Sequence, residues 1–302
     1  MKKKIIVCVL LCFSLNLAFG QQWMTSLEMA KRMALSNNKM ILMVWEESVL
    51  IPYPGYILNE NGVPVRRYRN IFADEEVSKI LWDYFVPVIV SDHLYGSLYT
   101  EIEDKRSQDY IDKFNDDGFK VMDPNGNIIN INELTSEYFD ITNFIGRYGF
   151  NTEYLEQELL NYRAEKSFYS AFYLAERYID FATFVDKKVS SQVIDLSSVY
   201  LNEAKVLLET EALDNKEVLR QRCAMMELKQ YLVLGRPRKV LRELDRMEDE
   251  PGISPTNEGL GSFLYYTAYM LINKVEEAEQ WKSKVSLVDL KKVQAIINVN
   301  NR

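Results

Sequence analysis

The spacing of apolar residues changes once along this chain of 302 residues, near residue 150. Before that point, short apolar runs of strand length alternate with segments of helical period, and after it only the helical period continues. Met40 to Trp45 and Phe85 to Val90 are the clearest short runs, and such runs are typical of strands covered on both faces. The pattern predicts an α/β domain over residues 21–150 and an all-α domain over residues 151–302.

The remaining elements of the first domain follow from the same pattern. Helices are expected from Ser26 to Asn37-Asn38, over about Asp74 to Asp83, and over the acidic stretch Tyr99 to Phe114. Residues 52–69 hold three prolines and the turn signal Asn61-Gly62, which predicts a long loop or a hairpin insertion. Pro87 withholds one backbone donor from its strand, which indicates an edge position or a bulge.

A tight turn is expected near the end of the first domain. Two apolar runs flank Asp123-Pro124-Asn125-Gly126, which predicts antiparallel strands at Phe119 to Met122 and Ile128 to Ile131. Asp123, Asn125 and Asn127 imitate the start of a calcium loop. An EF-hand, however, needs Gly and Glu where Ile128 and Leu134 stand, so we interpret the segment as a hairpin turn.

The second domain shows apolar residues at spacings of three and four throughout. Such stripes begin near Phe168, Val193, Leu219, Val240, Leu264 and Val275. Short breaks such as Gly235-Arg236-Pro237 separate them, and Pro237 suits the first turn of a helix. Short breaks between helices imply antiparallel hairpins.

The first 20 residues predict a secretory signal peptide. A basic start at Lys2-Lys3-Lys4, the apolar run Ile5 to Ala18 and the small-residue pattern Ala18-Phe19-Gly20 occur in that order, with cleavage expected after Gly20. The alternatives are a retained anchor, for which 14 apolar residues are short, and a lipoprotein, for which Leu11 is a poor residue before Cys12. We therefore expect an exported protein in the periplasm or another bacterial envelope space, with no stable membrane span after cleavage.

Cysteine usage agrees with a fold held by its core. Cys8 and Cys12 would leave with the signal peptide, so the mature chain keeps Cys223 alone and has no internal disulfide. Cys223 shares a helical stripe with Leu219 and Met226, which favours a small buried hydrophobe over a reactive thiol.

Charge limits the class of partner. The formal net charge is -8, and loss of the three lysines of the signal peptide lowers it to about -11. Residues 21–150 hold 12 basic and 20 acidic side chains, whereas residues 151–302 hold 21 and 24. An acidic surface repels phosphate, which disfavours nucleic acid and anionic lipid as partners.

Residues 22–146 resemble secreted thioredoxin-like domains. The helix after Trp23 and the blocks Lys39 to Val44, Ile71 to Val77, Phe85 to Val90 and Met122 to Gly126 carry the resemblance. It implies a thioredoxin-like fold for the first domain.

The resemblance stops short of the family's active site. Its Cys-x-x-Cys pair would fall at Leu50 and Tyr53, with Pro52 between them, and its cis-proline would fall near Asp116 or Asp117. Thiol exchange needs an attacking thiolate and a second sulfur, so the resemblance implies the fold and not the redox activity.

The second domain resembles tetratricopeptide-type helical hairpins. Leu219 to Leu234 with Pro237 to Met247 look like one pair, and Phe263 to Ile272 with Val275 to Trp281 look like another. The expected fold is a helical-repeat (TPR-like) domain, and an irregular helical bundle is the alternative.

Two candidate catalytic sites in the first domain have simpler interpretations. His93, the single histidine, lacks the neighbours of a triad or zinc site and is interpreted as a loop residue. Glu46, Glu47 and Asp92 follow neighbouring strands, where carboxylates can do acid–base chemistry if one is desolvated. Chance proximity in an acidic chain is the favoured interpretation of these three.

Tyrosines of the second domain are the candidate binding residues. Tyr169 and Tyr173 lie one position off an apolar stripe, as do Tyr265 and Tyr269 on a later helix. Exposed tyrosines at helical spacing can line a peptide-binding surface. The alternative is that they fill a wide helix interface.

The sequence therefore predicts a non-enzymatic interaction protein whose partner is another protein or an extended peptide. We expect no catalytic residue, metal or cofactor. Two other classes stay open: an enzyme with an unrecognised carboxylate-based site, and a structural accessory of a cell-envelope assembly.

Overall fold

The computed structural model describes residues 22–132, 138–249 and 252–301, so the expected signal peptide lies outside the described residues. A mixed α/β part is followed by a mostly helical part, as the hydrophobic pattern predicts. The described residues divide into two compact units: 22–126 with 131–150, and 127–130 with 151–301.

A four-stranded sheet has the order β4-β1-β5-β6, and its strands β4, β1 and β5 lie in the first unit. Its strands are β1 (Met40–Trp45), β4 (Phe85–Val90), β5 (Phe119–Met122) and β6 (Ile128–Asn132). The central β1 is buried along its whole length and runs parallel to β4 and antiparallel to β5. The edge position of β4 accommodates Pro87, and beyond it Met24 forms a single bridge with Val88.

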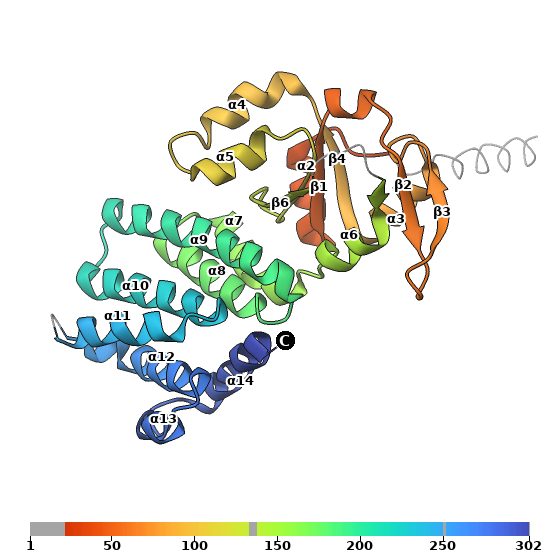
Figure 1. The fold of residues 1–302 in the computed structure, drawn as a ribbon. Helices are drawn as coiled ribbons and strands as arrows, with labels where there is room; N and C mark the ends of the chain where they lie inside the picture. Colours follow the sequence, from red (N-terminus) through yellow and green to blue (C-terminus); the bar gives the residue numbers. More distant parts are fainter. Residues whose placement is uncertain (1–21, 133–137, 250–251, 302) are drawn as a thin grey trace, which may run out of the picture. The chain divides into compact units, whose positions relative to one another are not determined.

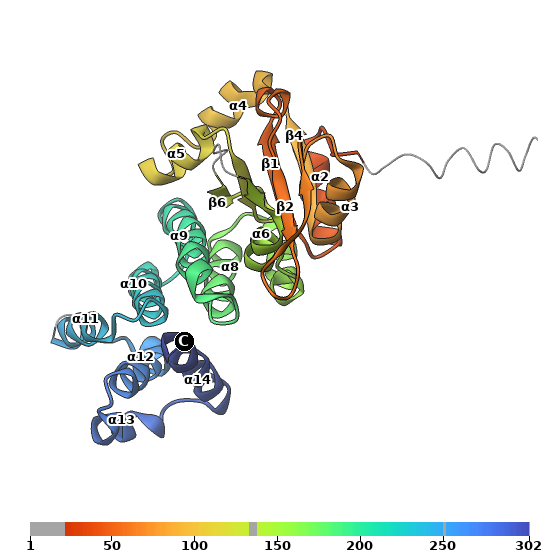
Figure 2. The ribbon, with the colours of Figure 1, turned by 45° about the vertical axis from the view of Figure 1, so that its right-hand side comes forward.

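Helices α2 (Leu27–Ser36) and α3 (Glu75–Tyr84) both contact β4, as Figures 1 and 2 show. Each begins where the sequence offers a cap, because the side chains of Ser26 and Asp74 accept backbone N–H groups of the first turn. Helix α6, which also belongs to this unit, spans Ile141–Tyr148.

The acidic stretch expected as one helix forms two. These are α4 (Tyr95–Thr100) and α5 (Gln108–Asn115). The reason is local, because the hydroxyl of Ser107 accepts the N–H of Tyr110 and starts a new helix there.

Residues 52–69 form the hairpin insertion. β2 (Gly55–Leu58) pairs antiparallel with β3 (Pro64–Tyr68), and the turn between them uses Gly62 at a φ of 73°. β7 (Phe139–Asp140) pairs with β2 and completes a three-stranded sheet with the order β3-β2-β7.

The second unit contains a succession of helices (Figure 1). They are α7 (Glu156–Ala164), α8 (Phe168–Phe181), α9 (Lys187–Thr210), α10 (Lys216–Val233), α11 (Pro237–Asp249), α12 (Glu258–Leu271), α13 (Val275–Lys282) and α14 (Leu287–Asn301). Helices adjacent in sequence from α7 to α13 pack together, and α10 also contacts α8 and α12. The start of α11 at Pro237 confirms the expected position of that proline.

The pattern did not predict α7 and α14. Helix α14 buries only the spaced residues Val293, Ile296 and Val299, against α10 and α12. Short 3₁₀ turns occupy Glu47–Leu50 (η2), Asp92–Leu94 (η3), Glu153–Leu155 (η4) and Pro255–Asn257 (η5). Among the described residues, no helix combines the length and apolarity needed to cross a membrane.

Candidate functional site on helix α8

One face of α8 carries both exposed aromatic rings and buried charges. The helix begins with a capping box between Ser167 and Ser170, and its apolar stripe is buried. A different face of α8 from this stripe carries four residues at spacings of four, three and four, which places them in one row along the helix. In chain order they are Tyr169, Tyr173, Glu176 and Asp180.

The first half of this row is a pair of stacked tyrosines. Tyr169 is 45% exposed and Tyr173 is 48% exposed, and their ring centroids lie 6.2 Å apart at an interplanar angle of 21°. The buried rings of Phe168 and Phe172 support them, at centroid distances of 5.0 Å from Tyr169 and 5.7 Å from Tyr173. The two phenols form a firm exposed surface, as a binding role requires, while that role itself stays a prediction.

The structure corrects the placement of the other two predicted tyrosines. Tyr265 is only 4% exposed, its ring stacks on Trp281 at 4.2 Å, and its hydroxyl lies 3.2 Å from Asp245 Oδ1. Burial, together with the Asp245 carboxylate, raises the pKa of Tyr265 well above its usual range. Tyr269 is half-buried beside Tyr265. Because α12 is packed against α10, α11, α13 and α14, a position off its main stripe is still an interior position.

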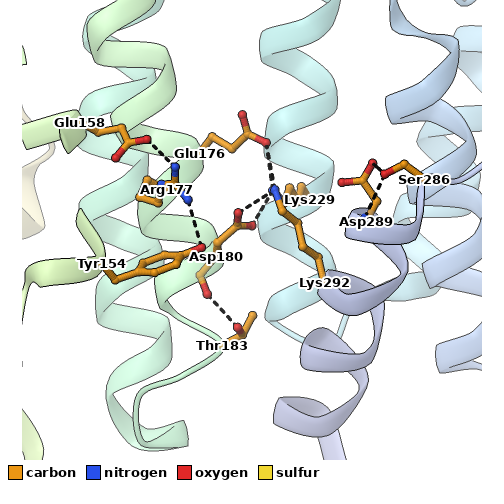
Figure 3. Close-up of polar contacts among 10 residues, drawn as sticks. All are labelled: Tyr154, Glu158, Glu176, Arg177, Asp180, Thr183, Lys229, Ser286, Asp289 and Lys292. Atoms are coloured by element: carbon orange, nitrogen blue, oxygen red, sulfur yellow. Dashed lines mark hydrogen bonds and ion pairs between the residues drawn. The ribbon is translucent and has the colours of Figure 1, made fainter. Parts of the chain in front are cut away.

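The second half of the row is a buried charge network that joins three helices (Figure 3). Asp180 of α8 is 7% exposed, and its two oxygens lie 2.7 Å from Lys229 Nζ of α10 and 2.9 Å from Lys292 Nζ of α14. Glu176 Oε1 lies 3.3 Å from Lys229 Nζ and 3.8 Å from Lys292 Nζ. Burial alone would raise the pKa of Asp180, but the two ammonium groups outweigh it and hold that pKa below its usual value.

A second ion pair fixes α8 to the segment before it. Arg177 donates to Glu158 at 2.6 Å and to the Tyr154 hydroxyl at 3.3 Å, and its guanidinium lies over the Tyr154 ring. The hydrogen bond to Glu158 raises the pKa of Arg177, so this cation stays charged. The two networks link α8 to α7, α10 and α14, in the part of the helix that follows the tyrosine pair.

The charged side chains of these networks are paired with opposite charges. Each carboxylate of the α8–α10–α14 network already contacts ammonium groups, so neither is free to act as a base. In the part of the chain that the structure describes, no group of histidine, cysteine and carboxylate side chains could hold a metal ion. The arrangement is suited to positioning helices.

The two positions expected for redox cysteines have opposite environments. Leu50 ends η2 and is 76% exposed, whereas Tyr53 is 5% exposed and packs among Phe72, Phe119 and Phe139. Neither position carries sulfur.

The carboxylate of Asp92, after β4, contacts the backbone after β1 and not a second carboxylate. Asp92 Oδ2 accepts the N–H of Glu47 at 2.9 Å, which ties η2 to η3, while the side chains of Glu46 and Glu47 are exposed. His93 is exposed in η3. The hydrogen bond of Asp92 is a structural cap and not an acid–base pair.

The turn after β5 has the hydrogen bonds of a tight turn. Asp123 Oδ1 accepts the N–H of Asn125 at 3.0 Å, its carbonyl accepts that of Gly126 at 2.9 Å, and Gly126 has a φ of 88°. The hairpin-turn interpretation of Asp123, Asn125 and Asn127 is confirmed at the level of the turn itself.

Sequence reasoning missed a buried lysine in the sheet. Lys120 of β5 is fully buried, its Nζ donates to the carbonyls of Asp116 and Gly118, and it lies 5.5 Å from the Trp45 ring. Burial lowers the pKa of Lys120 to about 8, against the opposing effect of the Asp116 and Asp117 carboxylates. The only available signal was a lysine inside an otherwise apolar strand.

Comparisons with known proteins gave no match: no family model fits the chain, and neither the curated proteins nor the solved structures include one that matches it.

Proposed function

We propose that this chain is an exported, non-catalytic protein–protein interaction protein. Its first unit is a thioredoxin-like domain without redox cysteines, and its second is a TPR-like helical domain. The helical domain binds an extended segment of another protein at Tyr169 and Tyr173.

The order and pairing of the strands support a thioredoxin-like first unit. β1 lies between a parallel β4 and an antiparallel β5, two helices contact β4, and the Asp-Pro-Asn-Gly turn follows β5. Without sulfur at Leu50 and Tyr53 the unit has no route to thiol exchange at those positions.

Helix packing supports a TPR-like second unit. Neighbouring helices pack in succession, and α10 contacts both α8 and α12, as expected when helix pairs stack in a row. In such a stack the equivalent helices of successive pairs form one continuous surface, which suits an extended ligand.

The exposed Tyr169–Tyr173 stack carries the proposal. Two aromatic rings nearly half exposed on one helix face leave apolar area in water, although the helix beneath them is fixed by buried ion pairs. Tyrosine combines large contact area with a polar tip and few rotatable bonds, which favours it at protein interfaces.

The test is affinity capture from native envelope extract with the mature protein as bait. The Tyr169→Ala and Tyr173→Ala double variant should lose the captured partner by about thirtyfold in affinity, the effect of one central interface residue. Tyr84→Ala is the matched control, because Tyr84 is equally exposed, at 45%, but lies on α3 of the other unit. Unchanged capture by a folded double variant would refute the proposed binding surface.

Export has its own test. Sequencing of the protein from cells should show a mature N-terminus at Gln21, and a protein that still begins at Met1 would contradict the assignment.

A further inference from the structure

Arg222 of α10 is a cation that has no carboxylate partner among the described residues. Its side chain is partly exposed, yet its Nε is closed off from solvent and donates no hydrogen bond to any described residue. Within the same described residues it forms no ion pair, whereas Lys229, two turns later on α10, contacts two carboxylates. A buried donor without an acceptor costs free energy, so such a group calls for an explanation.

Arg222 lies next to the residue that supports the tyrosine pair. The guanidinium carbon of Arg222 lies 5.9 Å from the centroid of the Phe172 ring, and Phe172 in turn supports Tyr173. Tyr173 stacks on Tyr169, and α8 contacts α10 directly. Lys229 meets Glu176 and Asp180, and Arg222, seven residues earlier on α10, meets Phe172. The two helices therefore run in the same direction, and Arg222 lies level with Tyr169 and Tyr173 along them.

Arg222 differs from the neighbouring cations in its lack of a carboxylate among the described residues. In the network of α8, α10 and α14, Lys229 and Lys292 both pair with Glu176 and Asp180, and Asp289 adds a further negative charge near Lys292. Arg222 forms no such ion pair with any described residue, so its charge is available to an external anion. Residues 151–302 otherwise carry a small net negative charge, so this spot is a localised attraction for an anionic group.

We infer that the segment bound at Tyr169 and Tyr173 is an acidic linear peptide, in which an Asp or Glu side chain pairs with Arg222 and a neighbouring aromatic or aliphatic side chain packs on the phenol rings. Carboxylate is the natural acceptor for a guanidinium, because two parallel N–H groups can bind its two oxygens. This inference rests on the proposed function and adds the chemistry of the partner.

The experiment begins with selection of phage-displayed random linear peptides on the mature full-length protein. Selected peptides should be enriched in Asp and Glu next to an aromatic or aliphatic residue. The best binder is then synthesised with both ends capped, and its affinity is measured by fluorescence anisotropy against the parent protein and four variants. The variants are Arg222→Gln, Tyr169→Ala, Tyr173→Ala and the control Arg238→Gln, since Arg238 is an exposed arginine on α11.

Arg222→Gln should weaken the capped peptide by about tenfold or more, in keeping with a charge-assisted hydrogen bond, and Arg238→Gln should leave its affinity unchanged. A peptide whose Asp or Glu is replaced by the corresponding amide should bind the parent protein more weakly by the same factor. The same replacement should not change the affinity for Arg222→Gln. The amide peptide tests the carboxylate on the parent protein, so the result does not depend on the folding of a variant.

The outcomes separate this inference from the proposed function. Peptides that need the tyrosines but show no acidic preference, tolerate the amide replacement, or bind only through a free C-terminal carboxylate would overturn the acidic segment and leave the tyrosine surface in place. Selected peptides that are indifferent to both tyrosine variants would overturn the surface and the acidic segment together.

Discussion

Neutralising Asp180 is the sharpest test of the structure, because Asp180→Asn keeps the shape of the side chain and removes its charge. Lys229 is 2% exposed and would lose its 2.7 Å contact, which leaves Glu176 at 3.3 Å as its remaining carboxylate. Removing one partner of a buried ion pair costs about 3–5 kcal/mol, and the partial compensation by Glu176 places the expected loss near the lower end, at about 3 kcal/mol.

The loss should appear in the melting of the helical unit. A unit of this size shifts by roughly 2–4 °C per kcal/mol, so the transition followed by far-ultraviolet circular dichroism should fall by roughly 6–12 °C. The amides of α14 should also exchange faster, since Lys292 loses its closest carboxylate. Glu279→Gln is the matched control, an acid-to-amide change in the exposed pair with Lys282, and should shift the transition far less.

Acidity provides a second readout with a definite sign. The folded-state pKa of Asp180 lies below its unfolded value, so its contribution to the free energy of unfolding is fully present above about pH 4. The contribution is lost as the pH falls through the folded pKa, and Asp180→Asn should not show that loss.

Equal melting shifts for Asp180→Asn and Glu279→Gln would refute the assignment of a buried network. A companion variant separates an unpaired charge from lost packing. Asp180→Leu combined with Lys229→Met removes both charges and leaves Lys292 with Glu176, so it should recover most of the stability. If the double replacement is as unstable as Asp180→Asn, the damage comes from shape rather than from the unpaired ammonium.

Three further predictions concern single sites. Burial raises the pKa of Cys223 to about 11, so iodoacetamide should label it near neutral pH only after denaturation, and rapid labelling of the native protein would contradict its position in the core. The pKa of Lys120 in the folded chain is about 8, below its unfolded value, so the unfolded chain binds more protons between pH 8 and about 10. The stability of the first unit should therefore rise with pH across that window. Lys120→Met should abolish this rise, as measured by thermal unfolding followed by tryptophan fluorescence. With leucine at position 50 and tyrosine at position 53, the purified protein should not reduce insulin above buffer background, and clear turnover would reveal a redox site elsewhere.

Much of the local structure could be predicted from the amino-acid sequence. The continuous apolar run at Met40–Trp45 became a fully buried strand, Ser26 and Asp74 became helix caps, and Pro237 became the first residue of a helix. Each of these outcomes depends on groups a few residues apart, through side-chain period, capping or proline geometry, and such information is present in the sequence. The absence of cysteine at positions 50 and 53 is likewise evident from the sequence.

Tertiary packing decided which of the predicted tyrosines are exposed. Tyr169 and Tyr265 occupy similar positions relative to the apolar stripes of their helices, yet one is exposed and the other is stacked on Trp281. The difference comes from side chains on neighbouring helices, because Trp281 of α13 and Asp245 of α11 contact Tyr265, whereas Tyr169 is 45% exposed. Helical periodicity identifies the main buried stripe but not whether a second face is also covered.

The charge network could not be predicted from the local sequence pattern either. Asp180, Lys229 and Lys292 are separated by tens of residues, and nothing in their flanking sequences marks them among 36 basic and 44 acidic side chains. Their significance arises from burial, because a charge removed from water must find an opposite charge, and only the packing of α8, α10 and α14 brings these three together. The same packing leaves Arg222 without a carboxylate partner in the part of the chain that the structure describes, because the residue before Glu176 in the row on α8 is Tyr173.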